Sequence, residues 1–110
     1  MQDERHANYF HQAIIIGDAV IAYGQLVPHD SQIYQICQMV VKPKYQKQNI
    51  GGTILTALID LAIKENAIAL TLNSRLTAVG FYQKFGFQIH GLQFPSIITG
   101  VPHITMNKRL

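Results

Sequence analysis

The stretch from Met39 to Ala62 places the strictest limits on the fold, because its pattern indicates a strand, a short loop and a helix in direct succession. An apolar run ends at Pro43, the loop Gln46–Thr53 follows, and apolar residues then recur at helical spacing. A helix that starts straight after such a loop directs the unpaired backbone N–H groups of its first turn at one point, where the helix dipole favours negative charge. The sequence therefore predicts a phosphate-binding site at this loop.

Nearby charges and motif comparisons narrow the kind of phosphate site. Lys42, Lys44 and Lys47 lie in or beside the loop, so an anion would meet ammonium groups as well as backbone donors. No Gly-Lys-Ser/Thr follows the glycines, as a P-loop requires, and the dinucleotide fingerprint Gly-x-Gly-x-x-Gly is absent. The two common nucleotide-binding motifs are therefore excluded.

The loop resembles a third motif, the Gln/Arg-x-x-Gly-x-Gly/Ala pattern of the GNAT superfamily of acetyl-CoA-dependent N-acetyltransferases. Gln46 occupies the first position and Gly51 the last, while Asn49 stands where the family usually has Gly. Asn adopts the left-handed backbone conformation more readily than most other residues, so this departure is physically mild.

A second resemblance lies downstream, in Leu72–Phe87. This segment is similar to the family's Asn-Ala-Arg-x-x-Ala-x-x-Phe-Tyr-x-Lys-x-Gly-Phe pattern, with Ser74 in place of the usual small residue and Phe85 in place of Leu. The ending Gly100–Met106 resembles the Gly-Ile-Pro-His-x-x-Met tail of the ElaA-like subgroup. The first two motifs occur in the family's order and together cover roughly residues 36 to 90.

The order of the elements predicts an α+β fold with one parallel crossover, and the resemblance implies the GNAT-like acyl-CoA N-acyltransferase fold as one domain over residues 1–110. We expect a mixed, mostly antiparallel sheet and two main helices. The expected strands are Tyr9–Ile16, Ala19–Val27, Ile33–Val41, Ala67–Leu72, Phe87–Leu92 and His103–Arg109, with a turn at Pro28–Ser31. The expected helices are about Ile50–Asn66 and Leu76–Phe85, the second ended by Gly86 as its C-cap.

The strand and two helices that usually precede the hairpin in this family are missing from the expected elements. That region usually walls the acceptor side of the site. Three explanations stay open: a short family member, a wall supplied by another chain, or a fragment. Missing elements would leave apolar sheet surface uncovered, so a homo-oligomer, in particular a two-fold dimer, is expected.

The resemblance implies that the loop binds the pyrophosphate of acetyl-CoA and that the preceding strand pairs with the pantetheine amides as an added strand would. The implied cofactor-binding residues are Met39, Val40, Val41, Gln46, Lys47, Gln48, Asn49, Ile50, Gly51, Gly52, Thr53, Asn73 and Phe81. A backbone N–H of Val40 or Val41 would polarise the thioester carbonyl. For Asn73, a role as helix N-cap or turn residue is compatible with holding the cofactor arm.

The implied catalytic residue is Tyr82, which the family motif places beside the thioester sulfur, where its phenol can protonate the departing thiolate. A core tyrosine that only packs is the alternative. Many relatives also carry a basic carboxylate on the strand before the loop, but Ile33–Val41 contains none. An ammonium must lose a proton before it can attack, so a water relay, bulk solvent or a group such as His103 remain as acceptors of that proton.

Composition excludes several other classes of protein. The chain is 48% hydrophobic and 14% charged, as in ordinary globular proteins, and no apolar run approaches the ~20 residues of a membrane span. Residues 42–110 are basic, but they form no basic run and no basic helix face, so nucleic acid is not expected as a partner. The five histidines lack metal-ligand spacing, so no metal is expected. The single Cys37 is interpreted as buried apolar filler, and one cysteine together with the absence of a signal-peptide pattern fits the cytoplasm.

The predicted function is therefore that of an N-acetyltransferase in which a primary amine attacks acetyl-CoA directly. The acceptor amine belongs to a small molecule or a peptide. The alternative is a non-catalytic CoA-binding or protein-interaction module of the same fold.

Overall fold

The computed structural model describes residues 10–30, 32–46 and 48–110. Its first element is an antiparallel hairpin, in which β1 (Phe10–Ile16) pairs with β2 (Ala19–Asp30). The chain reverses at Gly17, whose φ of 60° lies in the left-handed region that Gly adopts without steric cost. The expected hairpin is thus confirmed; Tyr9, its expected first residue, lies outside the described part of the chain.

Strand β2 continues further than the sequence suggested, through Pro28 to Asp30, and pairs antiparallel with β3 (Ile33–Val41). The pairing with β1 starts at Phe10↔Leu26, so Pro28 has a strand on one side only within the described residues, a position in which a proline is tolerated. The turn predicted at Pro28–Ser31 is therefore wrong. The chain turns between Asp30 and Ile33, with Gln32 at a φ of 62°, and Ser31 is outside the described residues.

After the 3-10 turn η2 (Pro43–Tyr45), helix α1 (Ile50–Lys64) crosses the sheet and packs on β1, β2 and β3. Its buried side chains include Leu55 and Leu58. Gly24 of β2 allows this close approach, because a Cβ there would lie 2.8 Å from side-chain atoms of both Ile54 and Leu58. Helix α1 ends two residues before the predicted Asn66, which itself has a φ of 64°.

The crossover leads into β4 (Ala69–Arg75), which is parallel to β3 and antiparallel to β7 (Pro102–Arg109). Pairing with β7 continues to Arg75↔His103 and holds the chain extended three residues past the predicted end at Leu72. The predicted strand Phe87–Leu92 is instead the two-residue β5 (Gln88–Ile89), and β6 (Phe94–Pro95) was not expected.

The second predicted helix, Leu76–Phe85, is divided into the 3-10 turn η3 (Leu76–Ala78) and the short helix α2 (Val79–Gln83). Gly86 then has a φ of 91°, and the N–H of Phe87 donates back to the carbonyl of Tyr82 at 3.2 Å. Gly86 is thus the helix-terminating residue that the sequence predicted.

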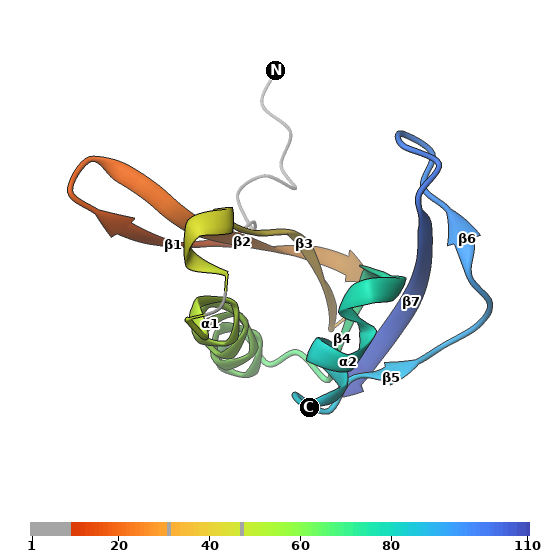
Figure 1. Cartoon of the computed structure of the whole chain (residues 1–110). Helices are drawn as coiled ribbons and strands as arrows, with labels where there is room; N and C mark the ends of the chain where they lie inside the picture. The colour runs from red at the N-terminus through yellow and green to blue at the C-terminus, as the bar shows by residue number, and fades with distance from the viewer. Residues whose placement is uncertain (1–9, 31, 47) are drawn as a thin grey trace, which may run out of the picture.

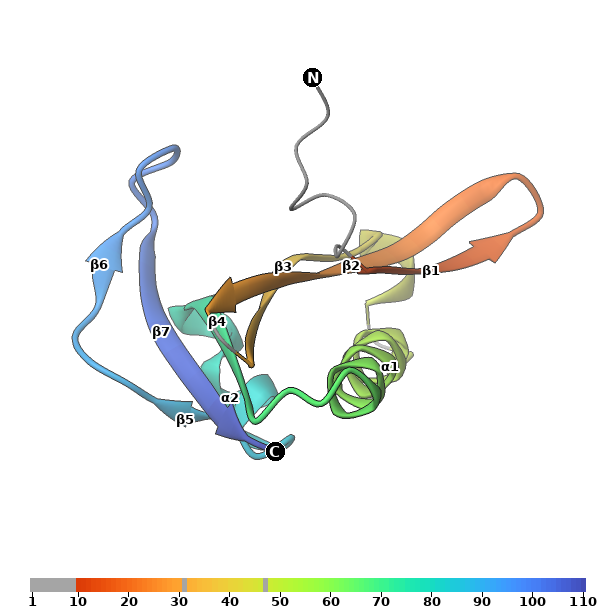
Figure 2. The ribbon, with the colours of Figure 1, turned by 180° about the vertical axis from the view of Figure 1, so that it is seen from behind.

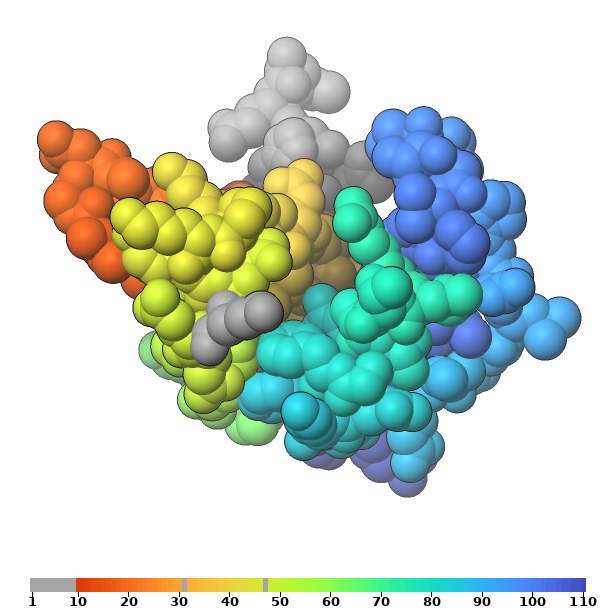
Figure 3. Space-filling view, viewed as in Figure 1, coloured from red at the N-terminus to blue at the C-terminus, as the bar shows by residue number. Residues whose placement is uncertain are grey.

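The strands form one mixed sheet in the order β1-β2-β3-β4-β7-β5, with β6 paired to β7 (Figures 1 and 2). Figure 1 shows β1–β3 and β4–β7 as two arms at an angle, with α1 and α2 in the angle between them. In the space-filling view the surface is hollowed between the start of α1 and the η3–α2 segment (Figure 3). The fold is the α+β arrangement expected, and none of the described helices is long and apolar enough to span a membrane.

Candidate active site

The hollow exists because the two central strands stop pairing part-way along their length. Strands β3 and β4 are in register only from Ile33↔Ala69 to Gln35↔Thr71. Beyond that pair the strands separate, and a cavity of about 250 Å³ lies between them, bordered by Ile36 and Met39 on one side. A parallel pair that opens in this way exposes backbone N–H and C=O groups along the inner edge of each strand.

A β-bulge in β3 changes which side chains face the hollow. Tyr23 pairs with Val40 but Gln25 pairs with Cys37, so β3 has one extra residue here, and Gln38 has a φ of 55°. Before the bulge, Ile36 packs in the core with α1; after it, Met39 and Val41 do. Since alternate side chains of a strand face opposite sides, only the extra residue allows both sets to face the same layer.

The backbone of Val41 faces the opening rather than the neighbouring strand. The N–H of Lys42 donates to the carbonyl of Ile21 in β2 at 2.9 Å. The backbone N–H and C=O groups of successive residues in a strand point to opposite sides, so those of Val40 point toward β2 and those of Val41 point away from it. Accordingly, the Nε2 of Gln46 donates to the carbonyl of Val41 at 3.0 Å. This hydrogen bond fixes the start of the loop to the open edge of β3.

Helix α1 begins at this edge, and within the described residues the N–H groups of its first turn have no backbone acceptor. Asn49 adopts the left-handed conformation (φ 59°, ψ 21°) that a Gly would otherwise supply, and its carbonyl accepts the first helical hydrogen bond, from the N–H of Thr53 at 3.2 Å. The N–H groups of Ile50, Gly51 and Gly52 precede that bond and have no intrahelical acceptor. They are directed at the same space, where the helix dipole favours an anion.

Three neighbouring cavities follow one another along the separated strands, each sharing lining residues with the next. We call the row of cavities the path and name each cavity by its position. The loop cavity (about 630 Å³) is lined by Met39, Val41, Gln46, Asn49, Gly51, Gly52, Thr77, Ala78, Phe81 and Tyr82. The central cavity (about 250 Å³) shares Met39, Ala78 and Tyr82 with it. The outer cavity (about 340 Å³) shares Ile36, Gln38, Asn73 and His103 with the central one.

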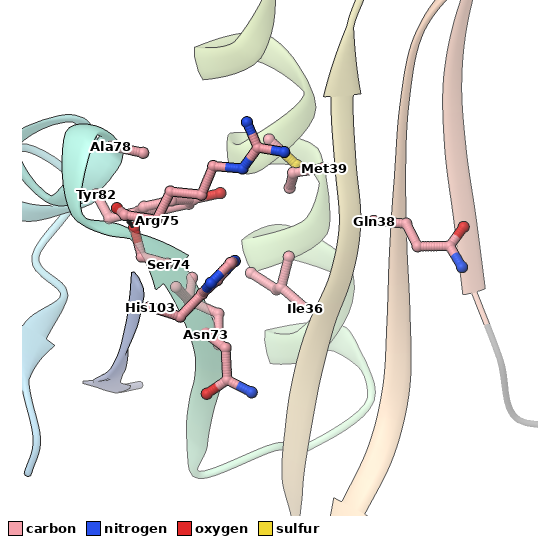
Figure 4. A pocket seen from close by; sticks show the side chains of 10 residues that line it. Ile36, Gln38, Met39, Asn73, Ser74, Arg75, Ala78, Tyr82 and His103 are labelled. Carbon is pink, nitrogen blue, oxygen red and sulfur yellow. Dashed lines mark hydrogen bonds between the residues drawn. The ribbon is translucent and has the colours of Figure 1, made fainter. Parts of the chain in front are cut away.

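Tyr82 stands between the loop cavity and the central cavity. It is 9% exposed, its ring packs edge-on against Phe81 and Phe87, and Figure 4 shows the side chain extending from α2 toward β3. Burial raises the pKa of the Tyr82 phenol above its ordinary value. The hydroxyl therefore keeps its proton throughout the neutral range and is available as a donor.

Asn73 and Arg75 border the central cavity from β4. The Oγ1 of Thr105 donates to the Oδ1 of Asn73 at 2.9 Å, which fixes the amide on the β7 side of the strand. The role of Asn73 as a helix N-cap is wrong, because the strand continues to Arg75, and it is Arg75 that precedes η3, without a side-chain cap bond.

The path contains most of the residues that the sequence singled out, but not all of them. Within the described residues, the lining of the three cavities does not include Val40, Gln48, Ile50 or Thr53, and Lys47 lies outside the described part. The sequence did not indicate the positions of Thr77, Ala78 and Arg75 in the lining, although all three lie within the second motif.

The described residues give little support to a metal site or to a reactive cysteine. Among the described residues there is no group of three or more His, Cys, Asp or Glu side chains that could hold a metal ion. Burial raises the pKa of the Cys37 thiol, which favours the unreactive protonated form.

Comparison with known proteins identifies the family. The model of the acetyltransferase (GNAT) domain matches residues 1–110. The chain belongs to the GNAT acetyltransferase family. A Bacillus subtilis (strain 168) protein that bears the name "putative acetyltransferase" is 28% identical over 107 residues, which are 97% of this chain and 67% of that protein.

Two solved structures show the same fold. Escherichia coli ElaA superposes with a TM-score of 0.84 at 18% identity, over 93% of this chain and 69% of that chain. An aminoglycoside 6'-N-acetyltransferase in complex with coenzyme A superposes with a TM-score of 0.81 at 18% identity, over 96% of this chain and 76% of that chain. The chain thus spans about two thirds to three quarters of the length of these three relatives.

Proposed function

We propose that this GNAT protein transfers the acetyl group of acetyl-CoA to a primary amine by direct attack. The observation that supports the proposal is the row of adjoining cavities that leads from the start of α1, past the buried Tyr82 phenol, to the far side of the separated strands. Such a path can hold a long, phosphate-bearing thioester at one end and admit a nucleophile at the other. Holding the two reactants in line would supply much of the rate acceleration.

The cofactor end of the path suits a pyrophosphate followed by an amide-bearing arm. The N–H groups of Ile50, Gly51 and Gly52, at the start of α1, would bind the pyrophosphate, with Lys42 and Lys44 close by in sequence. The backbone of Met39 and Val41 would pair with the pantetheine amides. Between the two valines considered for the thioester carbonyl, Val41 is the better donor, because its backbone faces the opening.

Tyr82 would act as the general acid. As the C–S bond of the tetrahedral intermediate breaks, negative charge develops on sulfur, and a neutral phenol at the junction of the two cavities can donate its proton there. The raised pKa of Tyr82 supports this role, since the phenol remains protonated at neutral pH.

The proposal is tested with Tyr82→Phe, which keeps the aromatic packing and removes only the proton. After a panel of amines has identified an acceptor, CoA release is followed by chromatography, and kcat is expected to fall about 10²–10⁴-fold with acetyl-CoA affinity nearly unchanged. Tyr34→Phe is the matched control, because Tyr34 packs against the core and does not line the path. Full kcat in the Tyr82→Phe variant, with chemistry rate-limiting, would show that Tyr82 only packs.

Two further expectations belong to this proposal. We place the reaction in the cytoplasm, with a small-molecule or peptide amine as acceptor, and we expect a homo-oligomer. Apolar side chains at the tip of the β1–β2 hairpin support an interface: Ile15 is 61% exposed, Ile16 54% and Val20 48%.

A further inference from the structure

His103 lines both the central cavity and the outer cavity. It follows the start of β7, directly across from Arg75 of β4. Figure 4 shows its ring extending from β7 toward Ile36, across the space between the separated strands. The side chain is therefore at the point where an acceptor entering through the outer cavity would approach a thioester held beside Tyr82.

A backbone contact fixes which ring nitrogen of His103 carries hydrogen. The Nδ1 atom lies 2.8 Å from the carbonyl oxygen of Val101. A carbonyl oxygen can only accept, so this contact is a hydrogen bond only when Nδ1 is the protonated nitrogen. In the neutral imidazole the lone pair then lies on Nε2, at the far end of the ring from Val101. The ring of Phe94 lies beside the imidazole, with the two ring centroids 6.2 Å apart.

The other titratable groups beside His103 do not serve as proton acceptors near neutral pH. Within the described residues, the titratable side chains that line the central and outer cavities with it are Arg75, Tyr82 and Cys37, and none is a carboxylate. A guanidinium carries only hydrogen-bond donors and no acceptor. Burial raises the pKa of both the phenol and the thiol, so these two groups keep their protons. The imidazole of His103 is the remaining group, and a neutral imidazole has one ring nitrogen that can accept a proton.

We propose that the Nε2 of His103 accepts the proton that the substrate ammonium must lose, an inference that rests on the proposed acetyl transfer. The ammonium gives one proton to Nε2, and the freed lone pair forms the C–N bond to the thioester carbonyl carbon. The C–S bond then breaks with its electron pair on sulfur, which takes the proton of Tyr82. The second proton of the new amide nitrogen returns to Tyr82 through solvent, and His103 releases its proton to water, so one proton is produced for each acetyl group transferred.

His103→Asn is the informative variant, because the Asn amide can still donate to the Val101 carbonyl but cannot accept the proton. We expect kcat/KM for an ordinary alkylamine to fall about 100-fold at pH 7, with CoA binding unchanged. The loss should shrink as the pH approaches the range in which the free amine is already neutral. An aniline-type acceptor, neutral at pH 7, should lose no more than about twofold. His90→Asn is the control, since His90 is exposed and lines neither the central nor the outer cavity.

Three results would overturn the inference. One is an unchanged kcat/KM for the alkylamine. Another is an equal loss for both acceptors at every pH, which would make His103 a positioning residue. The third does not require activity: long-range ¹H–¹⁵N NMR of the neutral ring should give the Nδ1–H tautomer, and an Nε2–H tautomer would exclude the proposed base. If the wild-type protein acetylates no amine, the proposed function fails first, and the NMR result still decides whether Nε2 is free to accept a proton.

Discussion

Replacing Gly51 with Asp is the most direct perturbation of the proposed pyrophosphate site. A Cβ at this position would lie 3.5 Å from Cζ of Phe81 and 3.7 Å from Cγ2 of Val41, which are ordinary van der Waals distances. A Cβ therefore fits without moving its neighbours, at a position that lines the loop cavity. An acidic group in the first turn of a helix is also favourable, by about 0.3–1 kcal/mol, so Gly51→Asp should fold at least as well as the wild-type protein.

The effect on CoA follows from charge. Two unit charges about 5 Å apart repel by about 3 kcal/mol at an effective dielectric constant near 20, and salt reduces this value at a partly exposed site. Gly51→Asn has nearly the same shape without the charge, so the ratio of the two dissociation constants isolates the electrostatic part. We expect Gly51→Asp to bind CoA between about 10-fold and about 100-fold more weakly than Gly51→Asn.

Isothermal titration calorimetry and thermal shift provide the measurement. At a hundredfold excess of CoA over its Kd, binding should stabilise the wild-type protein by about 2.7 kcal/mol. The Asp variant should lose about half of that increase or more, while its own melting temperature without CoA is kept. Gly51→Ala is a second control, expected to bind CoA and to melt no lower than the wild-type protein. Equal CoA affinity in folded Asp and Asn variants would refute the placement of phosphate at the start of α1.

Three further predictions concern packing, pH and assembly. Gly24→Ala should lower the free energy of unfolding, measured in urea, by about 1–3 kcal/mol, because its Cβ would lie 2.8 Å from atoms of Ile54 and Leu58. The control is Gly80→Ala, which should be neutral or stabilising because nothing lies within 4 Å of its Cβ; equal effects of the two variants would contradict this account of α1 packing. Burial raises the pKa of Tyr82, so ionisation of the phenol should reduce the kcat of the wild-type protein only above about pH 10. If the kcat of the wild-type protein has already fallen fully by pH 9, and that of Tyr82→Phe has not, the assignment of Tyr82 as the acid is contradicted. Light scattering at high micromolar concentration should give a dimer mass, and a monomer mass would exclude the expected homo-oligomer.

The parts of the fold that the sequence predicted are those that depend on local chemistry. The first hairpin was predicted because β-branched residues flank Gly17, and the start of α1 because a loop with Asn49 precedes a helical pattern. Gly86 was identified as a C-cap because it follows an apolar helical pattern and can adopt a positive φ. The hairpin turn, the helix start and the helix end each depend on residues that are close together in the chain.

The predicted and observed elements differ where a strand far away in the sequence determines the local conformation. Strand β4 extends to Arg75 because β7, some thirty residues later, pairs with it, and no local pattern contains that information. The two-residue β5 is short because the chain leaves the sheet at Gly91, with a φ of 90°. The position of His103 at the junction of the cavities likewise depends on the register of β7 with β4, which the short tail motif does not reveal.

The bulge at Gln38 lets β3 hold one residue more than the stretch of β2 with which it pairs, without exchanging the two faces of the strand. Gln38 has a φ of 55°, a conformation that Gly, Asn and Asp adopt more readily than β-branched residues, and its side chain points away from the cleft (Figure 4). Deleting Gln38 would leave Cys37 opposite Gln25 and Val40 opposite Tyr23 in regular pairing, and Ile36, Met39 and Val41 would still face the same layer. The bulge is thus the point at which the length of this strand can change by one residue while the inner and outer surfaces of the edge beside the cleft stay as they are.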